Sequence, residues 1–386
     1  MVLKIEVEGT HKEMGVQQGT QLKEQYDKFL NAMLNSDLIK GAKPKFLPMG
    51  LIIRLLSWFS KKQLKPVLTK YSPKQNEYVL GLAEGFKIKN NLSYALNLLE
   101  IVTGHPTLTM TWPEGILACT QIFAVADATI DGVDVFSRNY DFPNELEEYQ
   151  MVRVAKPNSG YKNIGMTQMF ISGVHQGMNE KGLAIGINYG RSWKEDVNGL
   201  PDYRLSGLPS TMLVQETLES CATVEEAIEY IINYPMRGNG AHYGILDKQG
   251  NACVIETTAS RYAIRYPEDG ILVHTNLYRT EELMDANVPE SVTWKTKHMT
   301  RPYYLSPKRR YERAYELITQ MKGDLNREEL YKILSDHNNR EPDDDTVCTH
   351  GDVGSTLATI SCIPKKGEFW CTDTHPCKSE QELFKI

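Results

Sequence analysis

The sequence of 386 residues lacks long apolar runs, a strong excess of charge of one sign, and repeats or low-complexity tracts. No stretch of about 18 residues is continuously apolar, so we expect no transmembrane segment. Because the net charge is −6, we expect no positively charged surface of the kind that binds nucleic acid. Residues 1–7 alternate apolar and charged side chains like a strand, without the basic start and apolar core of a signal peptide.

The seven cysteines are an odd number, scattered through a long chain, which argues against a disulfide framework. One group near the C-terminus suggests zinc: Cys348 and His350, then Cys371, His375 and Cys377. This group contains no pair with the C-x₂-C spacing that is typical of zinc sites. We therefore expect reduced thiols, a cytoplasmic location, no metal ion and no organic cofactor.

Helix-start signals occur in the first 118 residues. Thr10 and Glu13 form a capping box, and Ser72 is followed by a proline at the first helical position. Gly15 and Gly19 weaken the first helix, because glycine is a poor helix former. The predicted helices are 11–34, one that begins at 73, and 94–102.

From Cys119 onward the pattern favours strands, interrupted by two pairs of helices. The predicted strands are 121–127, 133–139, 150–155, 174–179, 183–189, 242–247, 252–257, 261–266, 271–275, 355–363 and 367–372. The predicted helix pairs are 209–220 with 224–233, and 310–321 with 327–336. This order predicts an α+β fold in which two sheets lie between helix layers.

Cys119 is the candidate nucleophile, because it begins an apolar strand-like run and is followed one hairpin later by Arg138 and Asp141. A free thiol has a pKa of about 8.5 and is mostly protonated at neutral pH. If the chain were cut after Ala118, the new α-amine, with a pKa of about 7.7–8.0, could take the thiol proton. Arg138 would favour the thiolate, and Asp141 could orient the ammonium.

A tetrahedral intermediate also needs fixed donors for its oxyanion. Asn276 lies at the end of a predicted strand. Its side-chain amide can donate hydrogen bonds without carrying charge. We therefore take Asn276 as a candidate oxyanion donor.

Five blocks of sequence occur in a familiar order. They are Cys119-Thr120, SRNYDF at 137–142, GMNEKGLAIGIN at 177–188, His274-Thr275-Asn276, and SPKRRYER at 306–313. Together they resemble the N-terminal-nucleophile (Ntn) hydrolases, in the branch of choloylglycine hydrolases, penicillin V acylases and acyl-CoA:6-aminopenicillanate acyltransferases. The resemblance implies a four-layer αββα Ntn-hydrolase sandwich. It also implies reaction at a linear amide through an acyl-thioester.

The resemblance implies that Cys119 is the nucleophile, that its freed amine is the base, and that Arg138 and Asp141 are the pair beside the thiol. In the bile-salt branch little more than the initiator methionine precedes the cysteine. Here 118 residues precede it, which favours the acyltransferase-like branch, where an internal cut makes two subunits. That branch usually has glycine before the cysteine, and this chain has Ala118.

Three further residues match the family's oxyanion and arginine positions. Asn188 matches the hairpin residue that helps to form the oxyanion hole, with Tyr189 as a rival. Asn276 matches the second oxyanion donor. Arg310 matches the late arginine, with Arg309 as a rival.

The resemblance implies two parts: 1–118, a mostly helical segment and candidate α chain or propeptide, and 119–386, the catalytic domain and candidate β chain. The segment 104–115, with two prolines, is typical of a linker. The expected partner is a small-molecule acyl amide or acyl thioester, and a homo-oligomer is compatible with the sequence. Bile conjugates, penicillins, N-acyl amino acids and peptide-like amides all fit, and the nucleophile does not decide between hydrolase and acyltransferase.

Other interpretations remain open. The chain could be a binding protein that kept the fold and lost activity. A papain-like Cys/His pair would need a histidine beside Cys119, and His175, His242 and His274 are available.

Two segments have open roles. The apolar stretch 46–59 could be a docking helix, the cover of an acyl pocket or an amphipathic helix at a membrane surface. The long connection 191–207 hints at a substrate-facing role.

Overall fold

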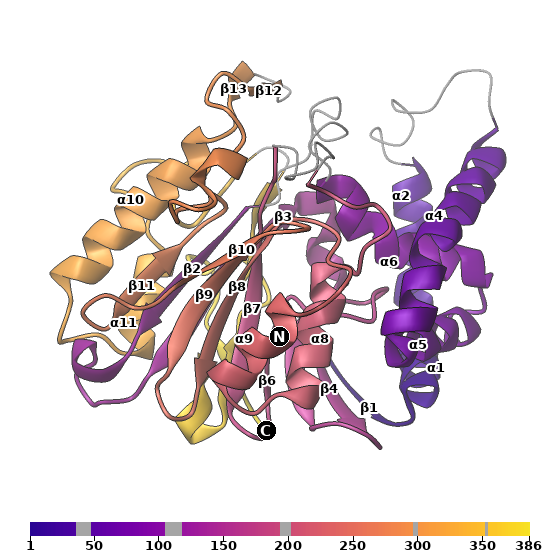
Figure 1. Cartoon of the computed structure of the whole chain (residues 1–386), viewed down its shortest axis with the longest axis horizontal. Helices are drawn as coiled ribbons and strands as arrows, with labels where there is room; N and C mark the ends of the chain where they lie inside the picture. Colours follow the sequence, from indigo (N-terminus) through magenta and orange to yellow (C-terminus); the bar gives the residue numbers. More distant parts are fainter. Residues whose placement is uncertain (36–47, 105–117, 194–201, 296–299, 352–353) are drawn as a thin grey trace.

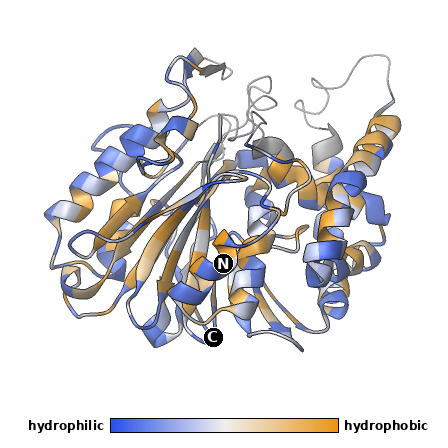
Figure 2. Cartoon of the chain, viewed as in Figure 1, coloured by the Kyte–Doolittle hydropathy of each residue, from blue (hydrophilic) through white to orange (hydrophobic). Residues whose placement is uncertain are grey.

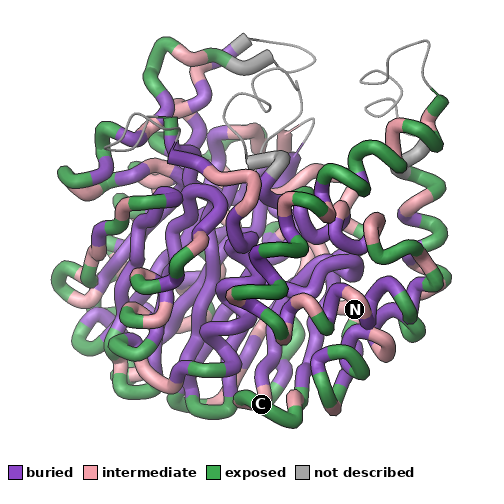
Figure 3. The backbone as a smooth tube through the Cα atoms, turned by 45° about the vertical axis from the view of Figure 1, so that its right-hand side comes forward, coloured by how far each residue is buried: buried purple, intermediate pink, exposed green. Residues whose placement is uncertain are grey.

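Two large β-sheets pack face to face between two pairs of helices, and a block of helices lies beside them (Figure 1). The computed structural model describes residues 1–35, 48–104, 118–193, 202–295, 300–351 and 354–386. Hydrophobic residues concentrate on the strands (Figure 2), and the strands are buried while the outer helix faces are exposed (Figure 3). This four-layer αββα arrangement confirms the predicted α+β fold.

The first sheet has eight strands. In order across the sheet they are β1 (Lys4–Gly9), β4 (Gln150–Pro157), β5 (Asn163–Gln168), β6 (Gln176–Asn179), β7 (Leu183–Tyr189), β8 (Ala241–Asp247), β9 (Ala252–Thr257) and β10 (Tyr262–Arg265). Neighbouring strands are antiparallel, except β1 and β4, which are parallel. Strand β5 was not predicted, since half of its residues are polar although all are buried.

The second sheet has six strands, all antiparallel to their neighbours. In order they are β11 (Ile271–His274), β2 (Ala118–Ala124), β3 (Val135–Pro143), β14 (Gly354–Ile363), β15 (Glu368–Cys371) and β16 (Glu382–Lys385). A separate ribbon consists of β12 (Thr293–Lys295) and β13 (Thr300–Pro302). Short 3₁₀ turns occur at Ala126–Ala128, Asn144–Tyr149, Met284–Ala286 and Pro364–Lys366. The short strands β12, β13 and β16 were not predicted.

Each outer helix pair covers one sheet. Helices α8 (Ser210–Ser220) and α9 (Val224–Ile232) contact β6 to β9, and helices α10 (Leu305–Gln320) and α11 (Arg327–Leu334) contact β2, β3, β11 and β14. The space between the sheets holds a core in which Phe123 and Phe136 stack with ring centroids 4.2 Å apart. Both helix pairs were predicted, with boundaries shifted by a few residues.

The N-terminal segment forms a helical block with five described helices. They are α1 (His11–Gln21), α2 (Lys23–Asn35), α4 (Met49–Tyr71), α5 (Pro73–Gly85) and α6 (Asn90–Gly104). The capping box at Thr10 and Glu13 is present, but the predicted helix 11–34 is interrupted at Leu22. At Gly15 the backbones of α1 and α5 approach so closely that a Cβ atom would lie 2.4 Å from the Tyr78 carbonyl oxygen. Glycine there serves packing between the helices.

Several contacts join the helical block to the rest of the chain. Strand β1 extends the first sheet by pairing with β4. Glu100 of α6 accepts hydrogen bonds from the backbone N–H groups of Ser210 and Thr211, where α8 begins, and a negative charge is favourable at that end of a helix. His11 lies 2.7 Å from the Glu219 carboxylate. Residues 1–35 and 48–104 therefore pack into the rest of the described chain, and the predicted boundary at 118/119 stays a prediction.

Some sequence predictions fall on parts that the structure does not describe. These are most of the linker 104–115, residues 194–201 of the connection 191–207, and residues 46–47 of the apolar stretch 46–59. The rest of that stretch begins α4, where Leu55, Leu56 and Trp58 are exposed, so its role stays open. Over the described ranges, no helix combines the length and apolar character needed to cross a membrane.

Candidate active site

Cys119 is the second residue of β2, which lies between β11 and β3 in the second sheet. Its side chain is fully buried and belongs to the core between the two sheets. Cys119 pairs with Tyr140 of β3, so both side chains lie on the same face of the sheet. Arg138, two residues before Tyr140, lies on that face as well, and its Nη2 donates a hydrogen bond to the Cys119 Sγ over 2.8 Å.

Asp141 lies on the opposite face of the same strand pair, because successive side chains of a strand alternate. Its backbone is in register with Ala118, the residue before the candidate nucleophile. Thr356 Oγ1 of β14 donates to Asp141 Oδ1 over 2.7 Å. Arg310 Nη1 of α10 lies 3.8 Å from Asp141 Oδ2. The predicted Arg138 and Asp141 therefore flank the start of β2 from two sides.

Burial and charge act against each other at the sulfur. Burial raises the pKa of the Cys119 thiol above its ordinary value, while the Arg138 guanidinium lowers it. The Asp141 carboxylate raises the thiol pKa, and Arg310 lowers it. Burial also raises the pKa of Asp141, and the charge of Arg310 is the strongest opposing effect. The thiol is therefore the favoured form in the uncut chain at neutral pH.

Asn188 reaches the site from β7 of the facing sheet. Its Nδ2 donates to the carbonyl oxygens of Thr275 (2.9 Å), His274 (3.1 Å) and Cys119 (3.4 Å). Arg138 Nε donates to Asn188 Oδ1 over 3.2 Å. The rival Tyr189 points elsewhere, since its hydroxyl lies 3.4 Å from the ring of His175.

Asn276 follows β11 and contacts the backbone of the candidate nucleophile. The Cys119 N–H donates to Asn276 Oδ1 over 3.0 Å, and Arg310 Nη2 donates to the same oxygen over 2.9 Å. Asn276 Nδ2 donates to the carbonyl oxygen of Tyr189 over 3.0 Å. In the intact chain Asn276 thus holds the N–H of the peptide bond that would be cut.

Arg310, and not its neighbour Arg309, lies in the site. Its fully buried guanidinium donates from Nη1 to the Cys119 carbonyl oxygen over 2.7 Å and to Thr120 Oγ1 over 2.8 Å. Arg309 is 49% exposed and pairs with Asp345. The hydroxyls of Thr120 and Thr356 were not predicted as part of the site. Thr120 follows the cysteine directly, whereas the sequence around Thr356 carries no signal.

The three histidines considered for a papain-like pair do not contact the sulfur. Among the described residues, no histidine is hydrogen-bonded to Cys119 Sγ. His175 contacts the hydroxyls of Tyr140 and Tyr189, and His242 packs on His274 with ring centroids 4.4 Å apart. Burial lowers the pKa of His242 to about 3. A buried, neutral imidazole of this kind is not the partner of a thiolate, so the Cys/His interpretation has no support.

The sequence from 129 to 376 matches the profile of a family described as acyl-coenzyme A:6-aminopenicillanic acid acyl-transferase. The match spans more than half of the chain. The chain belongs to this family. This confirms the resemblance to Ntn enzymes that transfer or hydrolyse acyl groups. The matched region contains Arg138, Asp141, Asn188, Asn276 and Arg310 but begins after Cys119, so the role of the cysteine stays a prediction for this family member.

Three solved structures show some likeness to the chain. A mutant form of conjugated bile acid hydrolase from Clostridium perfringens is 17% identical, with 69% of this chain and 97% of that chain covered and a TM-score of 0.43. An N-acylethanolamine-hydrolyzing acid amidase orthologue from Caenorhabditis elegans is 15% identical, with 64% of this chain and 93% of that chain covered and a TM-score of 0.45. Penicillin V acylase from Agrobacterium tumefaciens is also 15% identical, with 69% of this chain and 86% of that chain covered and a TM-score of 0.45. Likeness at this level adds nothing to the family assignment. No curated protein sequence matches the chain.

Proposed function

We propose that the chain cuts itself between Ala118 and Cys119 and then acts as a cysteine amidohydrolase or acyltransferase on a linear amide. One observation carries the proposal: the polar residues predicted as partners converge on Cys119. Arg138 contacts its sulfur, Asn276 its N–H, and Arg310 its carbonyl oxygen. A buried thiol that served only packing would have no need of these charged and polar contacts.

The self-cut is the first step. The Cys119 sulfur attacks the Ala118 carbonyl carbon, the C–N bond breaks, and the acyl group moves from nitrogen to sulfur. Water then hydrolyses the thioester, which leaves a carboxylate on Ala118 and a free amine on Cys119. Full burial of the sulfur does not oppose this step, because the attacked carbonyl is covalently adjacent and no substrate must enter.

The second stage uses the same sulfur on a substrate. The new α-amine takes the thiol proton, and Arg138 stabilises the thiolate. The thiolate attacks the substrate carbonyl, the oxyanion is stabilised by Asn188 and Asn276, and Asp141 orients the ammonium. The substrate C–N bond then breaks, and the leaving amine takes the proton from the ammonium. The acyl-thioester that remains is released to water or to a second amine. One oxyanion donor is typically worth about 10²–10³ in rate.

An N-acyltransferase and an inactive binding protein are the two alternatives, and they differ in whether they need the contacts around Cys119. An acyl-CoA-dependent N-acyltransferase would use the same thioester but pass the acyl group to an amine. An inactive binding protein would need none of the contacts around Cys119. The three hydrogen bonds that hold its sulfur, N–H and carbonyl oxygen therefore favour an enzyme.

The proposal is tested by the mass of the purified chain and by the fate of its acyl-enzyme. We expect two fragments that meet at 118/119 and stay together on gel filtration, because β1 and α6 are built into the rest of the molecule. Rapid-quench kinetics with an activated acyl amide should give a burst of acylated 119–386 fragment. Product ratios with and without an added amine separate hydrolysis from transfer. A chain that stayed whole while active on amides would refute the free-amine mechanism.

The rate of the self-cut is expected to rise with pH. Burial raises the pKa of the Cys119 thiol, so the protonated form persists to higher pH than in a free cysteine. The thiolate is the attacking form, and below the pKa its fraction grows about tenfold per pH unit. The cut therefore slows as pH falls.

This pH profile can be measured on freshly translated chain, by the appearance of the fragments over time. Arg138→Gln removes the cation that lowers the thiol pKa, so its profile should shift to higher pH. A cutting rate that did not change between neutral and mildly alkaline pH would count against attack by a thiolate.

A further inference from the structure

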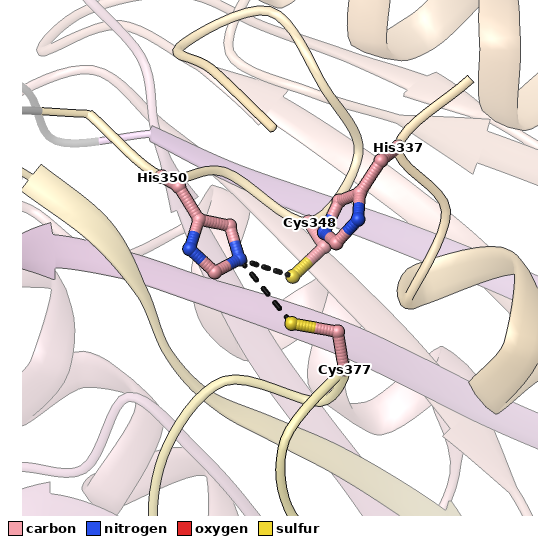
Figure 4. A group of neighbouring side chains, drawn as sticks. All are labelled: His337, Cys348, His350 and Cys377. Carbon is pink, nitrogen blue, oxygen red and sulfur yellow. Dashed lines mark hydrogen bonds between the residues drawn. The ribbon is translucent and has the colours of Figure 1, made fainter. Parts of the chain in front are cut away.

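Four side chains with metal-binding atoms meet beside the second sheet: His337, Cys348, His350 and Cys377 (Figure 4). Their donor atoms all lie within 4.8 Å of one another. They come from three segments: the segment that follows α11, the stretch before β14, and the connection between β15 and β16. Three of them, Cys348, His350 and Cys377, belong to the C-terminal group of the sequence that lacks the paired C-x₂-C spacing.

The distances are close to those of a tetrahedral zinc site. His350 Nε2 lies 3.3 Å from the Cys348 sulfur and 3.3 Å from the Cys377 sulfur. With Zn–S bonds of about 2.3 Å and Zn–N bonds of about 2.0–2.1 Å, a tetrahedron separates nitrogen from sulfur by about 3.5 Å. Two cysteines and two histidines form one of the common ligand sets of structural zinc.

His337 supplies an independent observation. Its Nε2 is buried and has no hydrogen-bond partner within the described part of the chain. Its ring packs edge-on against that of His350, with centroids 5.1 Å apart. A buried polar atom without a partner costs free energy, and a bound cation would accept the lone pair of this nitrogen.

We propose that His337, Cys348, His350 and Cys377 bind one zinc ion in a closed, structural site. Four protein ligands fill a tetrahedral shell and leave no position for water or substrate, as in structural rather than catalytic zinc sites. The expectation from the sequence that the chain holds no metal is replaced by this proposal. The competing chemistry at the same place is a disulfide between Cys348 and Cys377.

The zinc site would fix the segment 348–350, which contacts residues of the candidate active site. Thr349 lies between two of the ligands, and its N–H donates to Thr356 Oγ1 over 2.9 Å. Thr356 Oγ1 in turn donates to Asp141 Oδ1 over 2.7 Å. The ion would also tie the C-terminal connection, through Cys377, to the segment before β14. The role of the zinc ion is thus to position Thr356 and Asp141 and to cross-link the C-terminal connection to the segment before β14.

Metal content of the full chain tests the proposal. We expect one zinc ion per wild-type chain after purification without chelator, and its loss in Cys377→Ser and in His350→Gln. His375→Gln is the matched control, because this ring stacks on His350 with centroids 4.1 Å apart but lies outside the group of four. This control should keep its zinc. Circular dichroism checks that each variant is folded, and Cys377 is exposed, so its replacement by serine should be tolerated.

Cobalt and thiol chemistry give readouts that do not depend on activity. Chelated protein reconstituted with Co²⁺ should show visible tetrahedral bands and a near-ultraviolet thiolate band, both absent in Cys377→Ser. The Cys377 thiol should react slowly with a thiol reagent in the zinc form and fast after chelation. Repeating the measurements in Cys119→Ala separates this proposal from the self-cut, since metal binding should be unchanged. Wild-type protein that binds neither zinc nor cobalt, or that carries a Cys348–Cys377 disulfide when purified anaerobically, would overturn the proposal.

Discussion

Cys119→Ala is expected to leave one polypeptide of 43.9 kDa and to abolish both the self-cut and the formation of an acyl-enzyme. The alanine side chain has no nucleophile to attack the Ala118 carbonyl, and the base of the second stage, the freed amine, is never made. The loss should be complete, because alanine leaves residue 119 with no side-chain group that could attack the adjoining carbonyl. Intact-mass analysis and burst kinetics measure the two effects.

Two variants control for the loss of a buried side chain. Cys253→Ala removes another fully buried thiol, located on β9 away from the site, and this chain should be cut like the wild type. Cys119→Ser should keep some self-cutting, because a hydroxyl can carry out the acyl shift. A Cys119→Ala chain that still separated at 118/119 would show that another group performs the cut.

Arg310→Met is expected to slow the self-cut by about 10²-fold or more and to destabilise the fold by about 3–5 kcal/mol. The guanidinium holds the Cys119 carbonyl oxygen directly, and it holds Asn276 Oδ1, which accepts from the N–H of the bond that is cut. Its loss therefore loosens Cys119 on both sides of its Cα atom. The guanidinium also lies 3.8 Å from the fully buried Asp141 carboxylate, which then loses its strongest compensating charge. Denaturant unfolding and cleavage kinetics measure the two effects.

Three further variants separate the effect of Arg310 on stability from its effect on the rate of the self-cut. Arg309→Ala should change stability by about 0–1 kcal/mol and leave cutting intact, because the Arg309 side chain is 49% exposed and Asp345 keeps its second partner, Arg301. Arg310→Lys should rescue little, since one ammonium cannot reproduce the fork of the guanidinium. Arg310→Met combined with Asp141→Asn should recover part of the stability and none of the cutting. If Arg310→Met cut at the wild-type rate, Arg310 would have no role in orienting the peptide bond.

The secondary structure was largely predictable from local patterns. The capping box at Thr10 and the proline after Ser72 mark real helix starts, although the Ser72 side chain makes no capping hydrogen bond. Both signals depend on residues only a few positions apart. Strand β5 was missed, since its burial comes from neighbours rather than from its own residue types. Gly15 and Gly19 counted against a helix in the sequence, yet they permit the close approach of α5.

The candidate site was recognisable as ordered blocks, and the family match confirms the resemblance that they carried. Sequence order could not decide between Arg310 and Arg309, because adjacent residues of a helix point in different directions. Only the packing of α10 on the second sheet buries Arg310 against Cys119. The same holds for Asn188 over Tyr189, since alternation along β7 sends one side chain towards the facing sheet and the other away.

The sequence by itself determined the periodicities, the helix starts and the order of the family blocks, because these depend on residues close together in the chain. Tertiary structure alone decided which groups touch. It brings Arg138, Asn276 and Arg310 onto three atoms of Cys119, and it gathers His337, Cys348, His350 and Cys377 from three segments. Such contacts are made by side chains far apart in sequence, which meet only after sheets and helices have packed.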